Sequence, residues 1–335
     1  MQKIEEPRSL NTRRILIYLL VTFVLTYGIE IFLIMPLAGS ADLMQASLAQ
    51  LFKAGVMFIP AMGAFITRLV TKEKFTKDNL MLSLHLKGNL KYYGLAWFGM
   101  VLFIAFGAVL YFMLFPKQFD PDMGYVRRLL EEQMKLAGRD ASVSAEMVRQ
   151  TVIAQVVMGI ILSPFLNAVT CLGEEWGWRG FLLPKLLKRF RVVPTMLLGG
   201  VIWGLWHAPL ILIGHNYGIG YWGFPYAGIL AMCIFCIVVG TILSYVTIKT
   251  GSCIPAVMGH GTLNGFAAVG VCFVSLENPY NVFLGPMPVG LIGGAGLIVA
   301  AAVLLYILYR EENKKVLTFT SSGDKLNEHA VNADT

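Results

Sequence analysis

Apolar stretches of about 20 residues, the length that an α-helix needs to cross a bilayer, recur along the whole of this chain. We place them at residues 15–37, 51–70, 92–115, 151–172, 194–213, 226–248, 253–274 and 289–309. Hydrophobic residues make up 56% of the 335 residues and charged residues only 14%, which is not typical of a soluble domain. We therefore predict an all-α, polytopic membrane protein with about eight transmembrane helices.

The basic residues predict how these helices are oriented, because Lys and Arg accumulate in cytoplasmic loops. The segments on one side of the predicted membrane hold nineteen Lys and Arg, and those on the other side hold seven. Both termini are therefore expected in the cytoplasm. This bias accounts for the net charge of +7, so the charge gives no support to a nucleic-acid partner.

The spans divide the chain into five consecutive parts. We expect a cytoplasmic N-terminus (1–14), accessory transmembrane helices with an outer amphipathic loop (15–150), a core with the polar motifs (151–275), a last transmembrane helix (276–310) and a disordered cytoplasmic tail (311–335). Residues 125–136 alternate apolar and charged residues at helical spacing and should form the amphipathic helix. The five cysteines, including the CxxC of Cys233 and Cys236, are interpreted as small packing residues.

Three pairs of polar or aromatic residues interrupt the apolar runs of the core, each pair four residues apart. They are Glu175 with Arg179, Trp203 with His207, and His260 with Asn264. Residues at this spacing share one face of a helix. Ionisable groups cost roughly 2.5 to 3.5 kcal/mol each at the bilayer centre on insertion scales, so their presence indicates a functional site. We expect the three helices to point these residues at a common place.

The adjacent carboxylates Glu174 and Glu175 are the centre of this chemistry. Arg179 lies four residues after Glu175 and is its natural ion-pair partner. Glu174 points about 100° away around the helix. It is therefore the acid that we expect to take a proton from water.

The two histidines of the pairs suggest the rest of the site. His207 lies inside an apolar run with Pro209 just beyond it, whereas His215 is expected at the membrane interface. His260 and Asn264 can donate hydrogen bonds to an oxyanion. They could instead help to ligate a metal together with His207 and a Glu. The glycines around His260 are expected to allow close helix packing.

These motifs resemble the intramembrane proteases related to the CAAX prenyl protease Rce1, also called the CPBP (CAAX protease and bacteriocin-processing) or Abi family. The family pattern is Glu-Glu followed by Arg, then a His four residues after an aromatic, then a His four residues before Asn or Asp. Here the matching residues lie in this order between about residues 162 and 266. Trp203 and Trp178 stand where the family more often has other aromatics.

The resemblance makes 151–275 a CPBP-type catalytic core of an endopeptidase similar to CAAX prenyl protease 2. It implies that Glu174 and His207 activate water, that His260 and Asn264 stabilise the oxyanion, and that Glu175, Arg179 and Trp203 support the site. The family is described both as glutamate-type and as metalloprotease. Zinc held by Glu174, His207 and His260 is therefore a second possibility, although the chain has no HExxH motif.

The substrate class and the location follow less directly. We expect a peptide or membrane-protein substrate in a bacterial plasma membrane. A membrane protein that binds a bacteriocin or toxin and confers immunity without cleavage is the main alternative, and a transporter is a third. Straight helices would place Glu174 and His207 at different depths. A bend of the fourth helix at Pro164 and Asn167, or a later start of the fifth helix, would bring them together.

Overall fold

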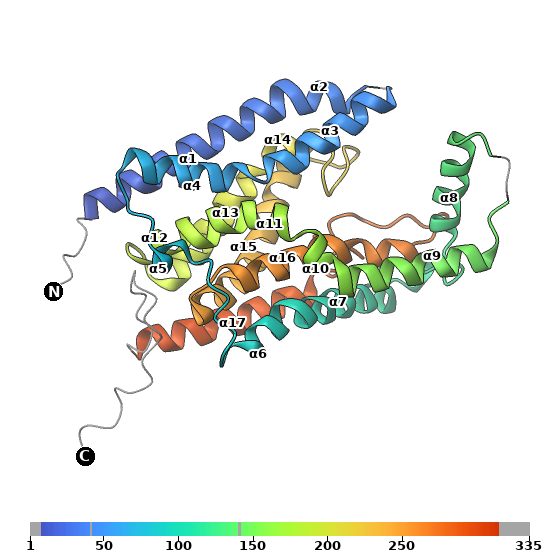
Figure 1. Cartoon of the computed structure of the whole chain (residues 1–335). Helices are drawn as coiled ribbons and strands as arrows, with labels where there is room; N and C mark the ends of the chain where they lie inside the picture. The colour runs from blue at the N-terminus through green and yellow to red at the C-terminus, as the bar shows by residue number, and fades with distance from the viewer. Residues whose placement is uncertain (1–7, 41, 140–141, 315–335) are drawn as a thin grey trace, which may run out of the picture. The chain divides into compact units, whose positions relative to one another are not determined.

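The computed structural model describes residues 8–40, 42–139 and 142–314 (Figure 1). Helices make up almost all of the regular structure there, and the β-pairing in these ranges is one isolated bridge between Phe119 and Val274. The predicted all-α class is confirmed. The first half of the predicted N-terminal segment and most of the predicted disordered tail lie outside the described residues.

The chain forms two compact units from interleaved segments. The first comprises Met1–Tyr93, Val169–Val257 and Ala301–Thr335, and the second comprises Gly94–Ala168 and Met258–Ala300. Because neither unit is one continuous stretch, they do not test the predicted division into consecutive parts. That division stays a prediction.

The first unit carries most of the candidate site. Its helices and helical turns are α1 (Arg8–Ile29), η1 (Glu30–Ile34), α2 (Met35–Ala38), α3 (Leu43–Val56), α4 (Ile59–Val70), α5 (Lys77–Leu80), α11 (Ala168–Glu175), η5 (Trp176–Leu182), α12 (Leu183–Leu187), α13 (Val192–Trp206), α14 (Ala208–Ile211) and α15 (Tyr226–Thr250). Within it, α1 packs along α4, and α13 packs along α15.

The second unit contains the remaining elements. They are η2 (Leu95–Gly99), α7 (Met100–Leu114), η3 (Pro116–Gln118), α8 (Gly124–Leu136), α9 (Ala145–Val157), η4 (Met158–Leu162), α10 (Ser163–Leu166) and η6 (Ala267–Phe273). Among the described helices, α6 (Leu90–Gly94), α16 (Ile254–Phe266) and α17 (Ala295–Asn313) continue from one unit into the other, as does α11 by its first residue.

Five of the described helical segments are long and apolar enough to cross a bilayer: Ser9–Ala38, Leu90–Leu114, Ala145–Leu166, Tyr226–Thr250 and Ile254–Phe273. A sixth span results if the bent pair Met44–Val56 and Ile59–Val70, which meet at 41°, counts as one. The protein is thus a multi-pass membrane protein by helix length and composition. The count of eight and the orientation of the termini are not confirmed.

Small residues let α13 lie very close to α15. A methyl group added at Gly200 would come within 2.4 Å of the Ile237 Cα, and one at Gly204 within 2.4 Å of the Cys233 Cα. Both contacts are with backbone atoms, which cannot move aside as a flexible side-chain end can. All five cysteines are free and buried, as expected for packing residues.

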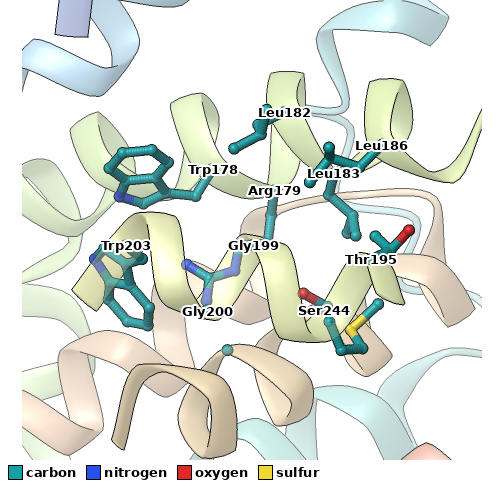
Figure 2. Close-up of a pocket in the computed structure, with 12 residues that line it drawn as sticks. Trp178, Arg179, Leu182, Leu183, Leu186, Thr195, Gly199, Gly200, Trp203 and Ser244 are labelled. Carbon is teal, nitrogen blue, oxygen red and sulfur yellow. The ribbon is translucent and has the colours of Figure 1, made fainter. Parts of the chain in front are cut away.

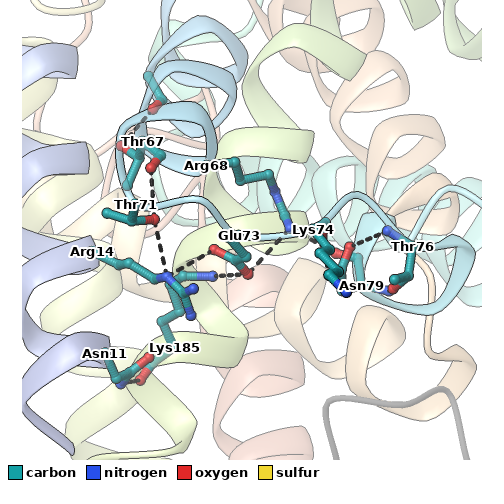
Figure 3. A network of polar contacts seen from close by, with 11 residues as sticks. Asn11, Arg14, Thr67, Arg68, Thr71, Glu73, Lys74, Thr76, Asn79 and Lys185 are labelled. Carbon is teal, nitrogen blue, oxygen red and sulfur yellow. Dashed lines mark hydrogen bonds and ion pairs between the residues drawn. The ribbon is translucent and has the colours of Figure 1, made fainter. Parts of the chain in front are cut away.

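A buried cluster of charges joins three elements of the first unit around the Glu73 carboxylate (Figure 3). Arg14 of α1, Arg68 of α4 and Lys185 of α12 lie 3.2, 3.1 and 3.0 Å from its oxygens. Charges this far from water need partners of opposite sign. The cluster therefore fixes how the ends of α1, α4 and α12 meet.

In the second unit the predicted amphipathic helix is present as α8. Val126 is part of a buried cluster with Val148, Val152 and Cys272, and Leu130 packs against it. The apolar face of α8 is therefore covered by α9 and η6.

We predict that Gly200→Ala destabilises the protein by about 1–3 kcal/mol, because the new methyl group would overlap with α15. Gly199→Ala is the matched control, since its methyl group would meet only the Leu186 Cδ1 atom at 3.9 Å. Ala is favoured over Gly in a helix interior by roughly 0.5–1 kcal/mol, so the control should be neutral or stabilising. Thermal unfolding in detergent compares the two, and equal midpoints would contradict the close packing.

A pH dependence of stability is predicted from Lys185. Burial lowers the pKa of this ammonium group to about 8, partly offset by Glu73. Between pH 8 and the ordinary pKa near 10.5, the unfolded state binds more protons than the folded state. The free energy of unfolding should therefore rise with pH over this range relative to that of Lys185→Met. Parallel stability curves for the two proteins would show that the pKa is not lowered.

Candidate active site

The buried ion pair predicted from spacing is formed where α11 ends and the π-helical turn η5 begins. Arg179 Nη1 lies 3.0 Å from Glu175 Oε1, and both side chains are almost completely buried. Glycine makes this position possible, because a Cβ atom at Gly177 would lie 2.4 Å from the Pro60 Cβ of α4. The α4 helix thus covers this turn closely.

Trp203 of α13 joins the acidic pair to the histidine. Its indole Nε1 donates a hydrogen bond of 2.9 Å to Glu174 Oε2. The guanidinium carbon of Arg179 lies 4.3 Å from the centroid of the same ring, a cation–π contact. Figure 2 shows the Arg179 guanidinium and the Trp203 ring beside each other. The predicted supporting role of Trp203 thus has a physical basis.

His207, directly after α13, is bonded to the backbone of the same tryptophan. Its Nδ1 lies 2.9 Å from the Trp203 carbonyl oxygen. A carbonyl oxygen only accepts, so Nδ1 carries the hydrogen, and Nε2 is the acceptor of the neutral ring. This tautomer is the one suited to orient a water molecule. Glu174 and His207 are thus both bonded to Trp203, one to its side chain and one to its backbone.

His215, which we expect at the membrane interface, has a ring contact that the sequence did not indicate. Its ring stacks on that of His207, with centroids 5.9 Å apart and an interplanar angle of 3°. Burial, with a smaller contribution from Lys53, lowers the pKa of His215 to about 4, so it is neutral at pH 7. The turn at Gly214, whose φ of 86° favours glycine, is the sequence signal for this reversal of the chain.

Glu30 is a second residue that the sequence reasoning did not single out. It begins the π-helical turn η1, is fully buried, and neither carboxylate oxygen has a hydrogen-bond partner among the described residues. Glu30 and Glu174 also interact electrostatically. The signal was available, because an acid in the predicted span 15–37 meets the same criterion that identified the other polar residues.

A small cavity lies beside the Arg179 side chain, lined by residues of η5, α12, α13 and α15 (Figure 2). Its volume of about 20 Å³ has room for a water molecule. Trp178 Nε1 and Thr195 Oγ1, two of its lining groups, are buried without a hydrogen-bond partner among the described residues. The Arg179 guanidinium of the ion pair therefore borders a small cavity that has polar groups in its lining.

His260 and Asn264 belong to the second unit, on α16. His260 is buried and Asn264 is exposed. A Cβ atom at Gly265 would lie 2.1 Å from the Ser163 Cβ, and one at Gly261 would lie 3.1 Å from the Pro164 Cα. These two glycines therefore have the predicted packing role. The convergence of His260 and Asn264 with Glu174 and His207 stays a prediction.

A helix break lies before Glu174 at Asn167, and the expected bend itself stays a prediction. Helix α10 ends at Leu166, and Asn167, which follows it, donates from Nδ2 to the Ser163 and Gly261 carbonyl oxygens at 3.1 and 3.2 Å. The helix thus breaks three residues after Pro164, and α11 then leads to Glu174.

No group of three His, Cys, Asp or Glu side chains within residues 8–40, 42–139 and 142–314 is arranged to hold a metal ion. In the first unit Glu174 and His207 are two of the three expected ligands, and His260 is in the second unit. Zinc bound by these three residues therefore stays a prediction.

The fold and these motifs define the class of protein. It is a multi-pass helical membrane protein whose candidate site contains buried Glu, His and Arg side chains. Residues 151–266 match the family described as type II CAAX prenyl endopeptidase Rce1-like. The resemblance expected from the motifs is thus confirmed for this segment, which contains every predicted site residue.

A curated relative supports the same resemblance over a shorter stretch. It is CAAX prenyl protease 2 of Methanococcus maripaludis, which is 38% identical over 53 residues. The match covers 16% of this chain and 20% of the relative, so the chain spans about a fifth of that protein's length.

We predict that Arg179→Met destabilises the protein by about 3–5 kcal/mol, because it leaves the Glu175 carboxylate buried without its cation. Arg128→Met is the matched control. Arg128 also pairs with an acid four residues away, Glu132, but the two side chains are 64% and 52% exposed. Exposed pairs contribute about 0–1 kcal/mol. Chemical denaturation in detergent measures the free energy of unfolding of both variants. Equal losses of stability would mean that burial does not determine how much an ion pair stabilises the protein.

Proposed function

We propose that this protein is an intramembrane endopeptidase that hydrolyses a peptide bond with water activated by Glu174 and His207. The single observation that carries the proposal is that Trp203 is hydrogen-bonded both to the Glu174 carboxylate and to His207 Nδ1. A carboxylate and an imidazole that are both hydrogen-bonded to one tryptophan suit general-base chemistry. The match of residues 151–266 to the Rce1-like family supports the same reaction.

The proposed reaction begins at the attacking water. Glu174 accepts one proton from it, while His207 Nε2 accepts a hydrogen bond and orients it. The water oxygen bonds to the carbonyl carbon, and His260 and Asn264 receive the resulting oxyanion. When the tetrahedral intermediate collapses, the C–N bond breaks and the proton held by Glu174 passes to the leaving amine.

Glu175 and Arg179 support this reaction without taking part in it. Their ion pair is buried, and the Arg179 guanidinium lies against the Trp203 ring. The pair therefore holds the indole in the position from which Nε1 reaches Glu174. We propose this as a structural role, in contrast to the chemical role of Glu174.

Zinc remains an alternative proposal for the same residues. Bound zinc would lower the pKa of water to about 7 and leave a glutamate as the base. Glu174, His207 and His260 are the ligands that we would expect, and the mechanism above does not depend on the ion.

The proposed substrate is a peptide or a membrane protein, in a bacterial plasma membrane. A prenylated protein is the alternative that the name of the Methanococcus maripaludis relative suggests. Both substrates would present a peptide bond to a buried site, so the chemistry at Glu174 is the same for each.

We predict that cells producing the wild-type protein contain new N- and C-terminal peptides of membrane proteins that cells producing Glu174→Gln lack. The substitution keeps the shape of the side chain but removes its basicity, so cleavage should fall by about 10²-fold or more. Quantitative mass spectrometry of peptide termini at equal expression measures this, and the new termini identify the substrate.

Glu277→Gln is the control, because it makes the same chemical change at an exposed acid. It should give the wild-type termini. If wild type and Glu174→Gln give identical termini while a protective phenotype against a toxin survives the substitution, the protease proposal is wrong and a binding role replaces it.

A further inference from the structure

The last turn of α13, which ends directly before His207, is hydrogen-bonded to α1. Trp206 Nε1 donates a hydrogen bond of 2.7 Å to Thr26 Oγ1. Tyr27 Oη donates a hydrogen bond of 2.7 Å to the Leu205 carbonyl oxygen. Thr26 and Trp206 are both almost completely buried. Two consecutive residues of α1 thus contact the two residues that precede His207.

The sequence after α13 explains why the Leu205 carbonyl needs a donor from another helix. In a regular α-helix this oxygen would accept a hydrogen bond from the backbone N–H four residues later. That residue is Pro209, which has no N–H. An unpaired carbonyl group costs free energy in an apolar environment. The Tyr27 hydroxyl therefore stabilises the helix end at which His207 lies.

The Trp206 ring connects α1 to the imidazole ring of His207. The two rings meet edge to face, with centroids 4.8 Å apart and an interplanar angle of 86°. His207 Nδ1 lies 2.9 Å from the Trp203 carbonyl oxygen. One hydrogen bond at Nδ1 fixes that atom but lets the ring pivot around it, so the neighbouring rings determine where Nε2 points. The indole that is held by Thr26 is one of these neighbours.

We propose that Thr26 is a positioning residue for catalysis. By holding the Trp206 indole, it fixes the plane of the His207 ring and therefore the direction of Nε2, the atom that orients the attacking water. This inference rests on the proposed function. Helix α1 lies outside residues 151–266, which match the Rce1-like family. The candidate site thus depends on a helix that the matching segment does not contain.

Thr26→Val tests the proposal, because it keeps the shape of the side chain but removes the acceptor for the Trp206 N–H. The substrate is a peptide that contains the cleavage site found from the termini, and the purified protein is held in lipid nanodiscs. We expect kcat to fall about tenfold or more with KM nearly unchanged, since a misplaced catalytic group slows the reaction without weakening substrate binding. Thr26→Ser keeps the hydroxyl and should recover most of kcat.

A double-variant comparison tests whether the hydrogen bond itself is responsible. Trp206→Phe keeps an aromatic ring in the position before His207 but removes the N–H donor. It should lower kcat as Thr26→Val does. The double variant should be no slower than either single variant, because both changes remove the same bond. Losses of kcat that multiply in the double variant would overturn the proposal.

Thr22→Val is the matched control, because it makes the same change one turn earlier on the same face of α1. Thr22 is buried, and a Cβ atom at Gly63 of α4 would lie 2.3 Å from its Oγ1, so this hydroxyl is directed at α4. The control should keep wild-type kcat. Equal losses of kcat in Thr22→Val and Thr26→Val, wild-type kcat in Thr26→Val, or failure of Thr26→Ser to recover kcat would each overturn the proposal.

A second measurement does not depend on cleavage. In nitrogen NMR spectra of the indole and imidazole groups, the resonances of Trp206 and His207 are those that disappear in Trp206→Phe and His207→Gln. Thr26→Val should shift both resonances, and Thr22→Val should shift neither. A shift of the Trp206 resonance alone would overturn the positioning of His207. If wild type cleaves nothing while both resonances shift, the proposed function fails and the positioning of His207 by α1 stands.

Discussion

Burial of charge in a low-dielectric interior is the constraint on which the candidate site depends. Glu174, Glu175 and Arg179 follow one another within six positions of the chain, and each is almost completely removed from solvent. The ion pair with Arg179 stabilises the Glu175 carboxylate. The Trp203 indole, which donates to Glu174 and lies under Arg179, makes burial of the second carboxylate tolerable. Any change that moves α13 therefore changes the acid–base properties of the site.

The sequence predicted the parts of this arrangement that are local. The Glu175–Arg179 pair, the break near Pro164 and the packing role of Gly261 and Gly265 all depend on spacing within one helix or on the backbone chemistry of Pro and Gly. Such features can be predicted without knowing where distant segments of the chain lie. The membrane class was predictable for a similar reason, since hydrophobicity is a property of each span alone.

The contacts of Glu30 and His215 could not be predicted in this way. His215 stacks on His207 because the chain reverses after α14, and the helical period contains no information on such a return. Glu30 is far from the other motifs in sequence and is related to Glu174 only through the packing of helices. The number of spans was also difficult to predict, because α3 and α4 meet at a bend of 41° and α13 has only 15 residues. Hydropathy is averaged along the sequence, so it does not reveal such bends and short helices.

The π-helical turn η5 has a consequence for how the Rce1-like segment tolerates change in length. A π-helical turn closes i to i+5 instead of i to i+4, so it accommodates one residue more than the α-helix around it. Removal of one residue between Trp176 and Leu182 would let a continuous α-helix form. The helix after the deletion would keep its direction, but side chains within the turn, that of Arg179 among them, would change their direction relative to Glu175 and Trp203. The π-helical geometry of this turn, as much as the identity of its residues, therefore determines that Arg179 faces Trp203.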